Sequence, residues 1–183
     1  MRLPVILLML AAAGAAQAPL KPASIVEPGV KPAAKPALSF QSMAELERRL
    51  DTKISSTGGA DPMLLLGPAR VLYLPGFGAI VTQEISLVVT PVISPFHLQV
   101  TAEDAVKVHQ RKVEHLPLLK KVMREMWADA ATSLSAVPDN EQMVLAIRLL
   151  YQPWENTAGL PAQVVMRGER KPALAGDLQV EEQ

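Results

Sequence analysis

The 183-residue chain contains no cysteine, and this absence excludes several kinds of structure and chemistry. There can be no disulfide framework, no thiol nucleophile, no cysteine metal site and no lipid attached through a thioether. Small exported domains usually rely on disulfides when their core is insufficient, so a domain in this chain must be stabilised by packing alone. The length suits one domain with a single core and a tail.

A surplus of charge is lacking as well. Eighteen basic residues balance 18 acidic ones, whereas phosphate binding requires a strongly basic surface. We therefore expect no nucleic-acid partner. A transmembrane helix needs about 20 apolar residues, and no segment after the N-terminal region approaches that, so we expect no transmembrane segment in the mature chain.

The common catalytic patterns are also missing. There is no Gly-x-Ser-x-Gly for a serine hydrolase and no His-Glu-x-x-His for a zinc enzyme. The three histidines, His97, His109 and His115, do not have the spacing of metal ligands. A soft copper site combining His115 with Met123 and Met126 is conceivable, but methionines on an apolar helical stripe are usually core residues. We expect no metal and no cofactor.

What the chain does have is an export signal at its start. One basic residue, Arg2, precedes an apolar run and a segment of small residues in 1–18, which is the pattern of a secretory signal peptide. Cleavage after Ala16 or after Ala18 fits the small-residue spacing, and retention as a membrane anchor is the alternative. The mature protein is expected to be exported, in the periplasm or outside the cell.

Residues 19–38 form a linker rich in proline, alanine and lysine. Five prolines in this stretch favour extended, polyproline-like chain that buries little surface. A tether and a disordered tail left by signal cleavage are both compatible with it. We expect one domain over residues 39–172 and a flexible tail over 173–183.

Hydrophobic periodicity within 39–172 predicts a helix, a hairpin, a long helix and a second hairpin. The first helix follows a possible capping box at Ser42. The long helix follows Thr101 and is expected either to kink at Pro117 or to divide there into two abutting helices. Basic residues between 107 and 124 are expected to form a solvated helix surface. The predicted helices cover about 42–54 and 101–135, and the predicted strands cover about 69–74, 79–90, 142–151 and 162–170.

This order has no regular alternation of strand and helix, so it favours an α+β fold. We predict two layers, a four-stranded, mainly antiparallel sheet with helices on one face. Roadblock and profilin-like domains are similar in this coarse outline. The phrase Tyr73-Leu74-Pro75-Gly76-Phe77-Gly78-Ala79-Ile80-Val81-Thr82 also resembles a glycine-aromatic-glycine hairpin of uncharacterised exported bacterial proteins. That resemblance covers about ten residues and implies no activity.

Three residues are candidates for a functional site. Glu84 lies among apolar neighbours in a predicted strand, where it would form a solvent-facing ion pair with Arg148 or Arg167 or line a pocket. Phe77 is at a predicted hairpin tip and Trp154 is in a predicted loop between strands. If both tips lie at one end of the sheet, these aromatics would form a partner-binding edge.

We interpret the chain as a non-enzymatic interaction module of the cell envelope, with a protein or envelope partner. The alternative is a small-ligand binder or hydrolase whose dispersed site surrounds Glu84. A homodimer is a third possibility, because Val106, Val113 and Leu118 are apolar residues outside the main stripe of the long helix.

Overall fold

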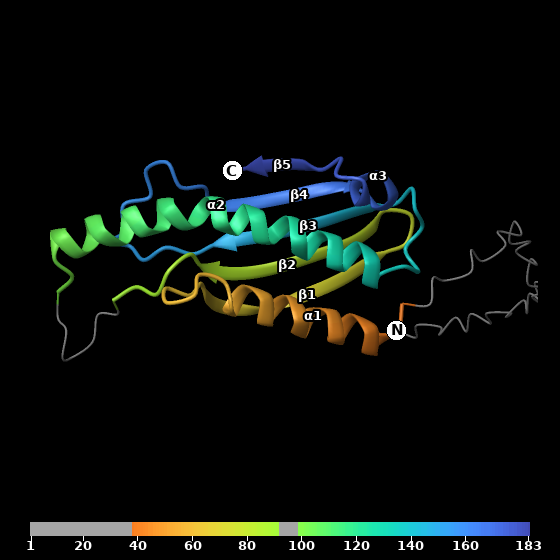
Figure 1. Ribbon diagram of the computed structural model, residues 1–183, viewed down its shortest axis with the longest axis horizontal. Coiled ribbons are helices and arrows are strands. Elements are labelled where there is room, and N and C mark those ends of the chain that lie inside the picture. The colour runs from red at the N-terminus through yellow and green to blue at the C-terminus, as the bar shows by residue number, and fades with distance from the viewer. Residues whose placement is uncertain (1–37, 92–98) are drawn as a thin grey trace, which may run out of the picture. The chain divides into compact units, whose positions relative to one another are not determined.

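The computed structural model describes residues 38–91 and 99–183 and combines three helices with one sheet (Figure 1). His97 and residues 1–37, which include the predicted signal and nearly all of the predicted linker, lie outside the described residues. The elements in chain order are α1 (Phe40–Ser55), β1 (Leu64–Leu74), β2 (Gly78–Ser86), α2 (Ala102–Ser133), β3 (Gln142–Leu149), β4 (Gln163–Glu169), α3 (Arg170–Leu174) and β5 (Gln179–Glu182).

The prediction of an α+β fold is confirmed, but the sheet differs from the predicted one. It has five strands in the order β1-β2-β3-β4-β5, and it is mixed because β2 and β3 run parallel. Parallel neighbours need a long crossover, and α2 supplies it by carrying the chain along the sheet from the end of β2 to the start of β3. The fifth strand, β5, comes from residues 173–183, which we expected to form a flexible tail.

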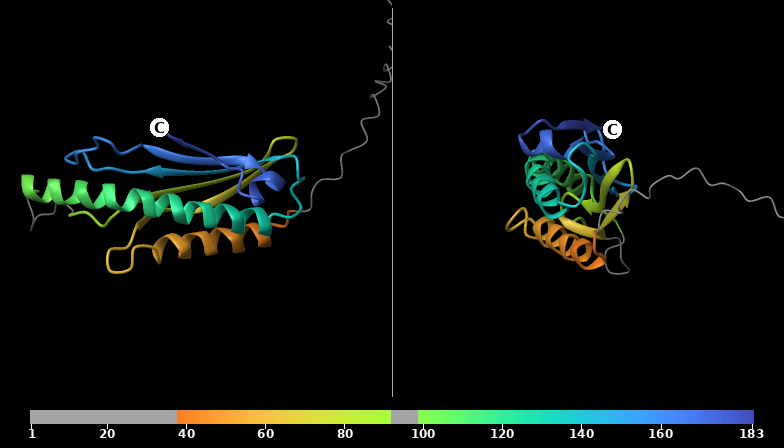
Figure 2. Two further views of the ribbon diagram at one scale, coloured as in Figure 1. Left: turned by 45° about the horizontal axis from the view of Figure 1, so that its top comes forward. Right: turned by 90° about the vertical axis from the view of Figure 1, so that its right-hand side faces the viewer.

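Helices α1 and α2 lie on one face of the sheet, and no helix of the described residues covers the opposite face (Figure 2). The apolar stripes predicted from the sequence make this contact. Leu46, Leu50 and Ile54 of α1 are fully buried. The α2 stripe is buried as well: Leu116, Leu119, Met123, Met126, Trp127 and Ala130. None of the described helices has both the length and the apolar character needed to cross a membrane.

Both long helices, α1 and α2, begin at a residue whose side chain caps the helix, although α1 begins earlier than predicted. The side chain of Thr101 caps α2 as expected by accepting a hydrogen bond from the backbone N–H of Asp104. The Asp104 side chain accepts in turn from the N–H of Thr101, which makes a capping box at α2, whereas the sequence analysis places one at Ser42 of α1 instead. Helix α1 begins slightly earlier than predicted, because Ser39 caps it by accepting from the N–H of Ser42.

Helix α2 is one continuous helix from Ala102 to Ser133, so Pro117 does not divide it into the two abutting helices that were one of the expected outcomes. Pro117 is exposed. Water can therefore satisfy the carbonyl group of Val113, which lacks its usual helical donor.

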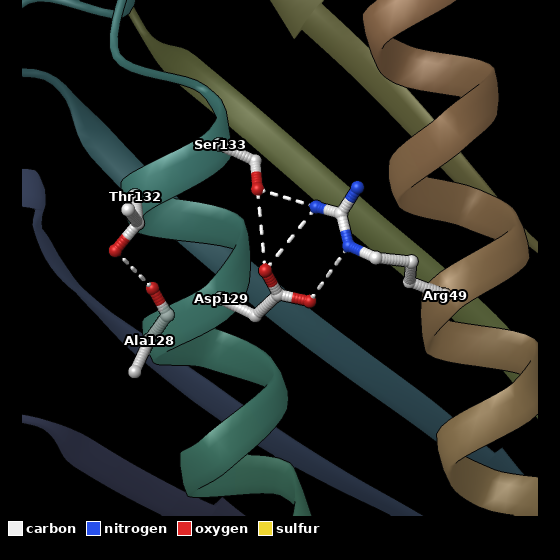
Figure 3. A network of polar contacts seen from close by, with 5 residues as sticks. All are labelled: Arg49, Ala128, Asp129, Thr132 and Ser133. Atoms are coloured by element: carbon white, nitrogen blue, oxygen red, sulfur yellow. Dashed lines mark hydrogen bonds and ion pairs between the residues drawn. The ribbon is translucent and has the colours of Figure 1, made fainter.

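The two helices are joined by an arginine (Figure 3). Arg49 of α1 donates to both carboxylate oxygens of Asp129, at 3.2 and 3.3 Å, and to the hydroxyl of Ser133, at 2.5 Å. The bidentate geometry fixes the rotation of α1 relative to α2 at their solvent-facing seam.

The exposed edge of β1 is protected by carboxylates of α1. Asp51 accepts from the N–H of Ala69 at 2.7 Å, and Glu47 accepts from the N–H of Val71 at 2.8 Å. The same Asp51 oxygen accepts from the side-chain amide of Gln83 at 2.8 Å, so it also satisfies part of a polar group in the core. These contacts occupy edge donors that would otherwise be open to another strand.

Candidate functional site

The sheet face opposite α1 and α2, which we call the outer face, is the candidate functional site. Side chains alternate along each strand, so register places the outward residues in rows across the sheet. One row is Leu72, Ile80, Val144, Arg167 and Gln179; the next is Arg70, Thr82, Ala146, Val165 and Glu181; a third is Gly67, Glu84, Arg148 and Gln163.

Strand β1 gives this face an unusual apolar character. Leu64, Leu66, Leu72 and Leu74 all point outward, and Leu72 retains 55% of its accessible surface. Single exposed leucines are common in soluble proteins, but four on one edge strand form an apolar strip, which the exposed Arg70 interrupts between Leu66 and Leu72. The strip continues into the sheet through the half-buried residues Ile80, Val144 and Val165.

The rest of the outer face is polar, and its charges are paired within the chain. Arg148 lies 3.4 Å from Glu84, and Arg167 lies 2.6 Å from Glu181. The third arginine, Arg70, reaches around the sheet edge to Glu47 of α1, at 3.5 Å. Each arginine of the face therefore has a carboxylate partner, and the face has no large surplus of charge.

Glu84 lines a hollow of about 420 Å³ in the outer face, as the sequence suggested for a pocket residue. The floor of the hollow includes Thr82 and Ala146, and its rim includes Arg70 and Arg148. Glu84 is also in the predicted ion pair with Arg148, and its side chain is 47% exposed. A carboxylate that is both paired and open to water lacks the enclosed environment that prepares an acid or base for catalysis.

A second hollow, of about 620 Å³, lies nearer the β1–β2 turn. Phe77, Val144 and Val165 contribute to its apolar part, and Arg167 and Glu181 to its polar part. Both hollows are open depressions of the same uncovered sheet face, and each is lined by both apolar and charged residues.

The two candidate aromatics lie at opposite ends of the sheet. Gly78, next to Phe77, pairs with Gln142 at the start of β3, whereas Trp154 follows the end of β3. Parallel pairing of β2 and β3 directs the two hairpin tips away from each other, so the predicted combined edge does not form. Phe77 is 43% exposed, but Trp154 is partly buried against the core.

A buried ion pair, not anticipated from the sequence, holds the β3–β4 loop on α2. Lys112 and Glu155 form a direct contact although their side chains are only 1% and 2% exposed. The ammonium also lies 4.7 Å from the centre of the Tyr151 ring. Burial lowers the pKa of Lys112 despite the opposing effect of Glu155, and burial together with Glu155 raises the pKa of Tyr151 to about 12.

Because both side chains are buried, this pair is not accessible to a substrate, and we assign it a structural role. It corrects the expectation that the basic residues of 107–124 all lie on a solvated surface. Arg111 is likewise engaged: its Nε donates to Asp61 at 2.8 Å, and this hydrogen bond is the main reason that the pKa of Asp61 is lowered. His109 contacts the carbonyl of Asn156 through Nδ1 at 2.9 Å.

Within residues 38–91 and 99–183, no group of three or more histidine, aspartate or glutamate side chains is arranged to hold a metal ion. The predicted strand began at Ala69, so the sequence analysis did not include Leu64 and Leu66 in it. Residues 64–66 and 71–74 are apolar or aromatic without alternation, so the sequence does not show which of them point outward. Sequence analysis missed Lys112–Glu155 because 43 residues separate the partners.

Comparison of the chain with protein-family models, with curated proteins and with solved structures gives no significant match. Function must therefore be argued from the outer face itself.

Proposed function

We propose that this chain is an exported, non-enzymatic interaction module of the cell envelope that binds a protein partner through its outer face. The observation that carries the proposal is the uncovered sheet face, in which an apolar strip is bordered by polar residues. Protein interfaces have this organisation, with an apolar centre and a polar rim. The apolar centre here consists of Leu72, Leu74, Ile80, Val144 and Val165.

The electrostatics of the face favour a protein partner over a polyanion. Nucleic acid and anionic lipid surfaces are bound by unpaired basic residues. Here the arginines at 70, 148 and 167 are each within 3.5 Å of a carboxylate of the same chain. Because these charges are already paired, a complex with this face would be stabilised mainly by burial of its apolar strip.

The export part of the proposal rests on the sequence pattern of residues 1–18, whose removal would leave the proline-rich stretch 19–38 on the N-terminal side of the domain. The resemblance to hairpins of exported bacterial proteins agrees with this location. N-terminal sequencing of the chain recovered from the envelope is expected to begin at Gln17 or Pro19; a start at Met1 would contradict removal of the signal.

Binding of a small ligand in the hollow beside Glu84 is the second candidate. Its volume of about 420 Å³ and its mixture of Thr82, Glu84 and Arg148 favour it. A hydrolase would need more, namely a catalytic group shielded from water, and the exposed Glu84–Arg148 pair does not provide one.

Single-cysteine variants test the proposed interface, because the chain has no native cysteine. Leu72→Cys reports on the outer face, and Val113→Cys is a matched control on the exposed side of α2, where the valine is 45% exposed. The measurement is the rate of maleimide modification in the intact envelope relative to the rate in the denatured chain.

We expect the thiol at position 72 to react several-fold more slowly than the thiol at position 113, because a bound partner covers the outer face. Equal relative rates at the two positions would contradict the proposal. Adding Glu84→Ala to the Leu72→Cys variant distinguishes the interface from a ligand site in the hollow. If the thiol at position 72 is still protected, its protection does not depend on a ligand bound beside Glu84.

A further inference from the structure

We infer that the partner on the outer face is a second copy of this chain, with the two sheets packed face to face. This inference rests on the proposed function and identifies its partner. Three features of the described residues support it: the size of the face, the balance of its charges, and the protection of the β1 edge.

The face is large enough for a specific dimer. Five strands spaced by about 4.8 Å, with a central strand of eight residues at about 3.3 Å each, make a plane of roughly 500 Å². The flat area of two such faces is about 1,000 Å², and projecting side chains would add to the surface that a dimer buries. This total reaches the lower bound for a specific interface. Packed sheets interdigitate side chains across about 10 Å, and the outward leucines of β1 with Val144 and Val165 suit that role.

The charge balance suits self-association in particular. In a symmetric dimer each copy presents the same surface to the other, so a face with net charge would repel itself. The Glu84–Arg148 and Arg167–Glu181 pairs neutralise the outer face internally. The outer face has no excess of charge that would attract a highly charged partner. A second outer face is equally neutral, so two copies would not repel each other.

The β1 edge is not free to pair with a strand of another chain, and this favours association through the outer face. Edge strands usually associate by adding another strand through their free N–H and C=O groups. In this chain Asp51 and Glu47 occupy the N–H groups of Ala69 and Val71 in the middle of β1. Edge-to-edge pairing through β1 would have to displace both carboxylates, but face-to-face packing leaves them undisturbed.

The other surface considered for a dimer, the outer side of α2, offers less. Leu118, one of its three expected contact residues, packs against the core of its own chain. Val106 and Val113 remain exposed but are separated by almost two helical turns. Two valines bury too little apolar surface to hold a dimer compared with the outer face.

The test is the mass of the purified exported chain, measured by size-exclusion chromatography with light scattering at micromolar concentrations. Two outer-face variants, Leu72→Glu and Val144→Glu, are compared with Val113→Glu, which places the same charge on α2. Circular dichroism confirms that each variant is folded, and Leu72, which is 55% exposed, is the position least able to disturb the monomer.

We expect the unsubstituted chain and Val113→Glu to have twice the mass of one chain, and Leu72→Glu and Val144→Glu to have the mass of one. A monomeric unsubstituted chain would overturn the inference. So would a dimer that dissociates with Val113→Glu, or one that survives both outer-face substitutions.

The two proposals fail in distinguishable ways. If the purified chain is a monomer but the thiol at position 72 is protected in the envelope, the second copy is wrong and the interaction module stands with a different protein partner. If the purified chain is a monomer and positions 72 and 113 react equally in the envelope, both proposals are wrong.

Discussion

At the scale of single residues, the most consequential feature is a charged pair with almost no exposure to water. Lys112 on α2 and Glu155 in the β3–β4 loop are in direct contact, and the ring of Tyr151 lies beside the ammonium. Taking two charges out of water is costly, and their attraction offsets that cost only while both partners are present. The position of the β3–β4 loop on α2 therefore depends on this pair, together with the contact between His109 and the carbonyl of Asn156.

Removing one charge of this pair should be strongly destabilising. Glu155→Gln leaves Lys112 buried without a counter-charge, and we expect a loss of about 3 kcal/mol in the free energy of unfolding. The matched control is Glu84→Gln, which removes the carboxylate of the half-exposed pair with Arg148 and should cost at most about 1 kcal/mol. Urea unfolding monitored by tryptophan fluorescence measures the free energy of unfolding of both variants. Equal losses in the two variants would show that the buried pair contributes no more to stability than the exposed one.

At the scale of elements, periodicity identified most helices and strands and their buried sides. Alternation in β2 and β3 correctly separated core residues such as Val81 and Ile147 from outward ones such as Thr82 and Arg148. It could not determine that β2 and β3 are parallel neighbours, because strand order depends on where α2 packs. It also could not reveal β5, a four-residue strand that needs pairing with β4 to form.

The β1–β2 turn shows why one of its two glycines is indispensable. Gly78 has a φ of +132°, and a Cβ there would lie 1.8 Å from the carbonyl oxygen of Gln142 in β3. Gly76 has a φ of +83°, but open space surrounds it. Both positions favour glycine by conformation, and Gly78 alone is also required by the close approach of two strands.

Gly78→Ala should therefore destabilise the domain by about 3 kcal/mol or more, since strain and a steric clash with β3 combine. Gly76→Ala should cost only about 1 kcal/mol, from the left-handed backbone conformation. Thermal unfolding followed by circular dichroism compares the two. A Gly78→Ala variant as stable as Gly76→Ala would contradict the close packing of the turn against β3.

At the scale of the domain, salt bridges join segments that are far apart in sequence. Arg49 connects α1 to Asp129 of α2, Arg111 connects α2 to Asp61 after α1, and Lys120 connects α2 to Glu182 of β5. Sequence analysis could not identify these pairs, since the partners in each pair are separated by 50 residues or more. It identified Glu84 as a candidate, but it did not identify the outward leucines of the neighbouring strand β1.

The Asp61–Arg111 pair should make the stability of the whole domain sensitive to acid. The hydrogen bond from Arg111 holds the pKa of Asp61 below its ordinary value of 3.8 in the folded state, against the effect of partial burial. A carboxylate with a lowered folded pKa contributes stability that is complete above its unfolded pKa and disappears as pH falls through the folded value. Below pH 3.8 the unfolded state therefore binds this proton first, and folding is progressively disfavoured.

Asp61→Asn removes this contribution. At neutral pH we expect the variant to be less stable by about 1 kcal/mol, a modest value because the pair is partly exposed to solvent. The difference from the unsubstituted chain should shrink as pH falls below 3.8, and the two stabilities should converge in strong acid. Urea unfolding over a series of pH values measures the difference, and a gap that stays constant through the acid range would contradict a depressed pKa at Asp61.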